Sequence, residues 1–306
     1  MVSVSVIMPA FDAVATIDRA IDSALGQTLG DLEVIVVDDG SRDATVDLVR
    51  RREAADPRVR LVRMAQNGGP AAARNAALDV ACGEWVALLD ADDAWRPDRL
   101  ETLTAVAGYD FVADQILGWD DAAGMETGPF MRRAFAGDVD SVRLLRTGSG
   151  YDFGFLQPIM RRSFLESIDL RYPVSLRHGE DLVFYVRALA AGARFRVLPY
   201  GGYLYTTPRG RRSGVVSPHS HTRPDKAALA AALEAVAVEY GSRLSAAERA
   251  AFAWRADFYR TRIAFDDFVD ACRRRDAGAA IATFGAAPLR VSRHLARELW
   301  LRLVTG

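Results

Sequence analysis

The sequence has few cysteines and histidines and almost no net charge. Of its 306 residues, 2 are cysteine and 4 are histidine, and the formal net charge is −1. Cys82 and Cys272 lie far apart in the chain, so we expect two buried reduced thiols and no disulfide framework. A chain without a global basic field has no general attraction to nucleic acid. We therefore expect no nucleic-acid partner.

Long apolar runs are also missing. No stretch of 18 uncharged apolar residues occurs, so no segment is expected to span a membrane. Residues 1–9 lack the basic start and apolar core of a signal peptide. Both absences favour a cytoplasmic protein. Half of the residues are hydrophobic and 26% are charged, which suits one large α/β domain with a smaller appendage.

The first 110 residues alternate between strand and helix patterns. Residues 32–37 form an apolar run broken only by Glu33, as in a strand buried on both faces of a parallel sheet. Pro9 ends the first expected strand, and Pro70 can open a helix at its first turn. The pattern predicts a doubly wound α/β sheet. Its expected strands are 3–8, 32–37, 59–62 and 85–89, and its expected helices are 14–25, 43–55 and 70–80.

The pattern loosens after residue 110 and then becomes helical. Residues 114–128 are polar and contain glycine, so we expect a mobile segment, and we expect a flexible loop over 201–224. Helices are predicted at 179–191, 225–240 and 245–274, and a last one after Pro288; Ser245 and Glu248 fit a capping box. We therefore expect two domains, residues 1–224 and 225–306.

Acidic residues follow two of the expected strands. Asp38 and Asp39 end the second strand, where open α/β sheets bind ligands, and a carboxylate there can accept an N–H from a base such as uracil. The alternative is a turn that caps a helix. Asp90 and Asp92 lie two residues apart on extended chain and face one side. They can bind Mg²⁺ or Mn²⁺, which would neutralise a leaving diphosphate, or they form a solvated turn.

A third acidic pair opens the helix predicted at 179–191. Glu180 and Asp181 follow Gly179, where the helix dipole stabilises a carboxylate. Such a carboxylate can serve as a general base that removes a proton from a hydroxyl group. It can also simply cap the helix, and this alternative stays open.

Six short motifs occur in a distinctive order and spacing. They are Pro9-Ala10-Phe11, Asp38-Asp39-Gly40-Ser41, Asn67-Gly68-Gly69-Pro70, Ala73-Arg74-Asn75, Asp90-Ala91-Asp92 and Gly179-Glu180-Asp181. This set resembles the family 2 glycosyltransferases with the GT-A fold. The resemblance covers residues 2–217 and is nearest to the bacterial exopolysaccharide type, including succinoglycan enzymes. It implies a Rossmann-like doubly wound mixed sheet and an inverting, metal-dependent transfer of a sugar from a nucleotide donor, most similar to the UDP-using members.

The resemblance also implies a nucleotide pocket. Pro9, Ala10 and Phe11 would line it, with the Phe11 ring stacked on the base. Phe11 replaces a frequent tyrosine, so one polar contact is lost. Asp39 would accept from the base, and Arg74 would lie near the base and phosphates.

The chemistry is assigned to four carboxylates by the same resemblance. Asp92 would be the main ligand of Mn²⁺ or Mg²⁺, and Asp90 would contact the metal or the ribose. Asp181 would be the general base of a single displacement at the anomeric carbon, with Glu180 orienting groups beside it. The partners implied are a nucleotide-sugar donor and a saccharide or lipid-linked saccharide acceptor.

A basic loop and two tryptophans are weaker candidates. Arg212 lies in the basic run 208–213 and would close on the donor diphosphate. His219 or His221 could add a metal contact. Trp95 and Trp119 could contact sugar faces, but core packing is the favoured interpretation for Trp95.

The last predicted helix is basic and amphipathic. Arg290 and Arg297 alternate with Leu295, Leu299 and Trp300. Such a helix can lie on the inner face of a membrane, where lipid-linked acceptors occur, or pack on its own domain, and both interpretations stay open.

Two other functions are kept as alternatives. A sugar-1-phosphate nucleotidyltransferase uses a similar sheet, but it needs a glycine-rich basic loop after the first strand, where residues 9–13 contain neither glycine nor a basic residue. A non-catalytic sugar-nucleotide-binding module would not need both Asp92 and Asp181.

Overall fold

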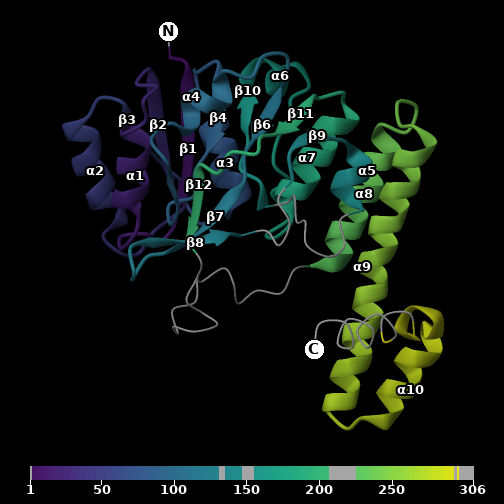
Figure 1. Cartoon of the computed structure of the whole chain (residues 1–306). Helices are drawn as coiled ribbons and strands as arrows, with labels where there is room; N and C mark the ends of the chain where they lie inside the picture. Colours follow the sequence, from purple (N-terminus) through teal and green to yellow (C-terminus); the bar gives the residue numbers. More distant parts are fainter. Residues whose placement is uncertain (1, 131–134, 147–154, 207–224, 293–294, 296–306) are drawn as a thin grey trace. The chain divides into compact units, whose positions relative to one another are not determined.

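The chain forms two compact units, Met1–Arg223 and Pro224–Gly306. The structure is a computed structural model that describes residues 2–130, 135–146, 155–206, 225–292 and 295. Figure 1 follows the chain from purple N-terminal strands to yellow C-terminal helices.

The first unit is built on an eight-stranded mixed sheet with the order β3-β2-β1-β4-β10-β6-β11-β9. The four strands β1 to β4 run parallel and lie side by side in Figure 1. The strand β10 is antiparallel to both of its neighbours, and β11 is parallel to β6. The eight strands are β1 (Val4–Ala10), β2 (Leu32–Asp38), β3 (Val59–Arg63), β4 (Trp85–Leu88), β6 (Phe111–Ala113), β9 (Gly137–Val139), β10 (Ile159–Arg161) and β11 (Phe195–Val197).

Burial of the central strands explains why their sequences read as apolar runs. Nearly every residue of β1 and β2 is buried, because both faces of the sheet are covered. The predicted helices of this half are present, so the expected α/β class is confirmed. The helices of the first unit are α1 (Ile17–Leu25), α2 (Thr45–Ala55), α3 (Pro70–Leu78), α4 (Arg99–Thr104), α5 (Ser141–Leu145), α6 (Arg162–Ser167) and α7 (Glu180–Ala190).

The first strand runs one residue past Pro9, where we expected it to stop. The Ile7 carbonyl accepts from Leu89 N on the side of β4. Backbone polar groups of a strand alternate between its two neighbouring strands, so the nitrogen of Pro9, two residues later, also faces the side of β4. The strand β4 pairs with β1 only as far as Ile7. A residue without an N–H is therefore tolerated at Pro9.

A second sheet overturns the expectation of a mobile segment over 114–128. Its order is β5-β12-β7-β8, with β7 (Ile116–Asp120) and β8 (Met125–Pro129) forming an antiparallel hairpin, β5 (Ala94–Trp95) and β12 (Tyr203–Thr206). Asp120 accepts from the N–H groups of Ala122 and Ala123, and Gly124 has a φ of 63°. Polar turn residues thus shape a tight hairpin.

The second unit consists of α8 (Lys226–Glu239), α9 (Ala246–Arg273) and α10 (Ala277–Ala286). The predicted capping box at Ser245 and Glu248 is present. The helix α10 was not expected; Asp276 caps it by accepting from Ala279 N at 2.9 Å. Of the helix predicted after Pro288, residues 288–292 are helical, and most of its basic face lies outside the described residues.

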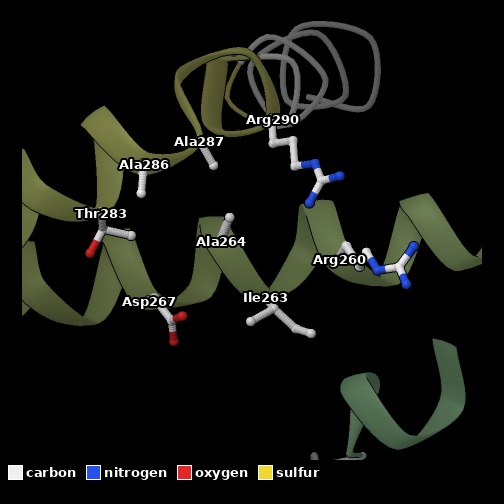
Figure 2. Close-up of a pocket in the computed structure, with 8 residues that line it drawn as sticks. All are labelled: Arg260, Ile263, Ala264, Asp267, Thr283, Ala286, Ala287 and Arg290. Carbon is white, nitrogen blue, oxygen red and sulfur yellow. The ribbon is translucent and has the colours of Figure 1, made fainter. Parts of the chain in front are cut away.

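A pocket of about 290 Å³ lies between α9 and α10 (Figure 2). Its two arginines are already paired: Arg260 with Glu234 at 2.6 Å, and Arg290 with Asp257 at 3.0 Å. The pocket therefore offers no unmatched charge from these two residues. Its lining residues are Arg260, Ile263, Ala264, Asp267, Thr283, Ala286, Ala287 and Arg290.

Both cysteines are free, but they are exposed rather than buried. Cys82 lies beyond the end of α3 and donates from Sγ to Glu33 at 3.1 Å, and Cys272 lies on α9. The alanine and glycine that flank Cys82 gave no sign of its exposure, whereas Cys272 is followed by three arginines. Within the described ranges, no helix has the length and apolar character needed to cross a membrane.

Candidate functional site

The parallel strands β1, β2 and β4 end at one edge of the sheet, and the candidate site is built there. Asp39 N donates to the Ala10 carbonyl at 2.8 Å, which joins the chain after β2 to the end of β1. The following loops are also joined, since Ala13 N donates to Thr45 Oγ1 at 2.8 Å. The residues predicted to form a nucleotide pocket thus lie on mutually supported loops. Phe11 is half-buried in the first of them.

Asp39 orders the loop that precedes α3. Its Oδ1 accepts from Gly68 N at 2.7 Å and its Oδ2 from Gly69 N at 2.8 Å. A Cβ on Gly68 would lie 2.8 Å from the Cβ of Ala72, so the close approach requires glycine. Each carboxylate oxygen has a second lone pair, and contact of Asp39 with a base stays a prediction.

Arg74 on α3 brings together three carboxylates from distant parts of the sequence. Its Nη1 donates to Glu180 Oε1 at 3.0 Å and to Asp181 Oδ1 at 3.1 Å, and its Nη2 donates to Asp90 Oδ1 at 3.0 Å. Asp90 follows β4, and the other two carboxylates open α7. The strand-end turn and the helix start therefore form one acidic cluster around one buried arginine.

Burial and mutual repulsion perturb this cluster. Burial raises the pKa of Asp181 to about 8; the charge of Arg74 opposes the rise, and the charges of Glu180 and Asp90 add to it. A strongly perturbed carboxylate in a polar cluster is a candidate functional group. The ring of Tyr172 lies under the guanidinium, 5.4 Å from its carbon, and stacks on Phe184 of α7.

Glu180 and Asp181 differ in their access to solvent. The side chain of Glu180 is 8% exposed, whereas that of Asp181 is 17% exposed and that of Asp90 is 26% exposed. Asp181 is thus the more accessible member of the pair. Glu180 is placed to hold Arg74.

Asp92 and Asp93 are neighbours in the acidic turn, but one is exposed and the other is buried. Asp92 is exposed. Desolvation of its carboxyl group by the surrounding protein raises its pKa to about 6, and the charge of Asp90 adds to the rise. Asp93 is buried and accepts from Tyr203 Oη and Thr206 N, both at 2.7 Å. Asp93 therefore anchors the turn to β12. In the part of the chain that the structure describes, no group of three or more His, Cys, Asp or Glu side chains forms a metal cage.

Gln157 and Arg99 belong to the site's surroundings and were missed by the sequence reasoning. Gln157 Nε2 donates to Asp90 Oδ2 at 3.3 Å, and Arg99 Nη2 donates to the Gln157 carbonyl at 2.5 Å. Arg99 is fully buried and paired with Asp114 at 2.8 Å. Neither residue belongs to a motif with local spacing, so only the folded sheet brings them together.

The other candidates fall outside the cluster. Pro9 and Ala10 end β1, and Trp95 is a core residue, as favoured. Trp119 lies on β7 of the second sheet. Arg212, His219 and His221 lie outside the described residues.

Comparisons with known proteins agree with this architecture. The glycosyl transferase family 2 profile matches residues 5–166. Succinoglycan biosynthesis protein ExoU of Rhizobium meliloti is 37% identical over 289 residues, which cover 90% of this chain and 81% of that protein. Succinoglycan biosynthesis protein ExoO of the same organism is 39% identical over 223 residues, covering 70% and 63% of the two chains.

A solved structure supports the fold. The structure of S. aureus TarS 1-349 in complex with UDP-GlcNAc has a TM-score of 0.65 and 23% sequence identity to this chain, and covers 94% of it. The comparison covers 81% of the TarS chain. The chain belongs to glycosyl transferase family 2 and is a glycosyltransferase.

Proposed function

We propose that this glycosyltransferase moves a sugar from a UDP-sugar to a saccharide or lipid-linked saccharide acceptor during exopolysaccharide assembly. The transfer inverts the anomeric carbon and depends on Mn²⁺ or Mg²⁺. Similarity to two succinoglycan biosynthesis proteins supports the pathway class, and similarity to a UDP-GlcNAc-bound structure supports the donor class.

One observation carries the proposal: Arg74 holds Asp181 near Asp90 at the end of β4. Inverting displacement needs a base on the acceptor side and stabilisation of charge on the leaving-group side. Asp90 and Asp92 supply the second function and Asp181 the first. The two functions are therefore adjacent yet supplied by different elements, β4 and α7.

The carboxylates of Asp90 and Asp92 suit a cation that also binds the substrate. Mg²⁺ is usually held by one or two carboxylates together with substrate phosphates and water. Asp90 and Asp92 provide two carboxylates, and Asp92 is exposed, so a diphosphate can approach it from solvent. The pKa of Asp92 is raised in part by the charge of Asp90, so a cation here relieves repulsion. The bound cation would neutralise the departing diphosphate.

Asp181 accepts the proton of the acceptor hydroxyl as that oxygen attacks the sugar. The C–O bond to the diphosphate breaks as the new glycosidic bond forms, and the proton ends on the Asp181 carboxylate. Arg74 keeps the carboxylate aimed into the site, and Glu180 keeps Arg74 in place. Phe11 and Asp39 remain the proposed contacts to the base.

The deciding experiment is turnover with defined donors. UDP-glucose, UDP-galactose and UDP-GlcNAc are incubated with the protein and a set of p-nitrophenyl glycosides, with Mg²⁺ or with EDTA. We expect metal-dependent UDP release with one donor and a product of inverted anomeric configuration by NMR. Pyrophosphate formation or consumption would instead favour a nucleotidyltransferase, and donor binding without turnover would favour a binding module.

A further inference from the structure

Three aromatic rings meet beside the acidic turn. Phe130 follows β8, Tyr205 lies on β12, and Phe155 lies shortly before β10. The ring centroids of Phe130 are 5.3 Å from Phe155 and 4.6 Å from Tyr205, and Phe155 and Tyr205 are 6.3 Å apart. Their planes are tilted by 50° or more, as in edge-to-face aromatic clusters. We call these three residues the aromatic cluster.

The three rings differ in what they offer to solvent. Phe130 and Tyr205 are partly buried and pack against the hydrophobic core of the first unit. Phe155 is 41% exposed. The cluster therefore consists of two partly buried rings and one exposed ring that packs against them.

The chain after Phe155 runs directly into the candidate active site. Leu156 is buried, and its carbonyl accepts from Tyr185 Oη at 2.7 Å. Tyr185 lies one helical turn after Asp181 on α7, so the two share a face of that helix. Gln157 then bonds to Asp90 at 3.3 Å. The two residues after Phe155 thus contact α7, the helix that carries Asp181, and Asp90 itself.

Tyr205 places the same cluster beside the acidic turn from the other side. Burial raises the pKa of Tyr205, and the charges of Asp93, Asp92 and Asp90 add to the rise. Its neighbour Thr206 bonds to Asp93 through its N–H. The cluster therefore lies next to the turn.

We propose that the aromatic cluster is a subsite for the acceptor saccharide, with the exposed ring of Phe155 stacking on the apolar face of a pyranose. The inference rests on the proposed function, because it requires a saccharide acceptor. Ligand sites are lined by aromatic surface with a few convergent polar groups. Phe155 supplies the surface, and Asp181 supplies the polar group that meets the reacting hydroxyl.

Stacking explains why a ring without a polar atom is exposed here. The two partly buried rings fix the position of Phe155, so little side-chain entropy is lost on binding. A Phe155 that served packing alone would be replaceable by any apolar side chain of similar size. A stacking Phe155 needs a planar ring, and this difference can be measured.

The test compares three substitutions at Phe155 in the full chain. Acceptor KM, donor KM and kcat are measured with UDP-GlcNAc, UDP-glucose or UDP-galactose, whichever is transferred, and with the p-nitrophenyl glycoside that gives the highest kcat/KM. We expect Phe155→Ala and Phe155→Leu to raise acceptor KM by about tenfold, which corresponds to a loss of about 1.4 kcal/mol of binding free energy. Phe155→Trp keeps the ring and should stay within threefold of wild type. Donor KM should not change in any variant.

Met125→Ala is the matched control, because Met125 lies on β8, in the sheet that also contains Tyr205, and is 58% exposed. Its acceptor KM should equal that of wild type. An unchanged acceptor KM in Phe155→Ala overturns the proposed subsite, and so does an equal acceptor KM in the Leu and Trp variants. The proposed function still stands in either case if the wild type transfers sugar. A wild type that transfers no sugar overturns both.

Discussion

Arg74 carries one positive charge and bonds to three carboxylates, and this imbalance sets the chemistry of the site. If Asp90, Glu180 and Asp181 were all ionised, the buried cluster would carry a net charge of −2. Desolvation and repulsion make that state costly, so the cluster retains a proton at neutral pH, and Asp181 has its pKa raised to about 8. A base with a pKa near the working pH is well matched to proton transfer.

The first prediction concerns pH. Only the deprotonated form of Asp181 can accept a proton, so kcat/KM should rise with pH and level off above a midpoint close to 8. Well below the midpoint it should fall about tenfold per pH unit, because one proton is involved. Asp181→Asn cannot take the proton. Its kcat/KM should therefore no longer rise with pH, and its rate of transfer should be about 10²–10⁴-fold lower than that of wild type. The variant should bind UDP almost normally.

The amide of Asp181→Asn has nearly the shape of the protonated carboxyl group and the same charge, and the raised pKa favours that form at neutral pH, so the fold should persist. Asp181 lies in the first turn of α7, whose N-cap is Gly179, and no side chain caps this helix. If the carboxylate only stabilised the start of the helix, the rate of transfer would stay near wild type. A flat pH profile between pH 6 and 9 would point to Glu180 as the next candidate base.

A second prediction separates the carboxylate of Asp92 from its backbone. Arg19 Nη2 donates to the Asp92 carbonyl at 2.6 Å, a contact that a change of side chain does not remove. Asp92→Ala should therefore fold and should bind UDP in the presence of Mn²⁺ no more tightly than in EDTA, by calorimetry. Asp47→Ala, an exposed carboxylate on α2, is the control and should keep the metal effect. Metal-enhanced UDP binding by Asp92→Ala would remove Asp92 as a ligand.

The sequence predicted where these carboxylates gather better than it predicted their contacts. Strand ends, the Asp90-Ala91-Asp92 spacing and a helix start predicted which carboxylates gather at the site, and the structure brings Asp90 and Asp181 to one arginine. Arg74 was assigned to the base and phosphates, whereas its described donors go to carboxylates. No local pattern reveals a contact between residues that are 106 positions apart, such as Arg74 and Glu180.

At the scale of elements, a buried ion pair links the two sheets of the first unit. Arg99 at the start of α4 bonds to Asp114, which follows β6, and Asp114 also accepts from Gly202 N just before β12 at 2.7 Å. Both side chains are almost fully buried. Removal of one partner leaves a buried charge without compensation.

The third prediction follows from this pair. Arg99→Met should lower the free energy of unfolding by about 3–5 kcal/mol, the cost of breaking a buried ion pair. Urea unfolding followed by circular dichroism measures it. Adding Asp114→Leu should recover part of the loss, because the unpaired charge is then gone. Arg96→Met is the control: its pair with Glu126 is partly exposed and should contribute only about 0–1 kcal/mol. An equal effect of the two arginine variants would contradict this interpretation.

Elements with a strong period were predicted well, and elements set by long-range contacts were not. The strands β1 and β2 are apolar throughout because both faces are covered, and their ranges were predicted within about two residues. The hairpin of β7 and β8 has a polar, exposed outer strand, so hydrophobicity gives no strand signal there. The helix α10 buries none of its residues and contains two glycines, which explains why it was missed.

At the scale of the whole molecule, the family and fold follow from the order of motifs along the first unit, whereas the specificity does not. Phe11 is half-buried and Asp39 is already bonded to two glycine N–H groups, so the choice of base depends on contacts that the sequence motifs do not encode.

The last prediction therefore tests the base through the stability of the full chain. A ligand that binds only the native state at about 100 times its Kd adds about 2.7 kcal/mol of stability, which for a unit of this size corresponds to a rise in Tm of roughly 5–10 °C. UDP with Mn²⁺ should raise Tm by this amount, and EDTA should remove most of the rise, because Asp90 and Asp92 would hold a cation that neutralises the diphosphate. GDP and dTDP carry the same diphosphate and are the matched controls; they should raise Tm by less than half as much. An equal rise with GDP would overturn the uridine assignment of Asp39 and Phe11, and a UDP effect that EDTA leaves intact would overturn the metal dependence.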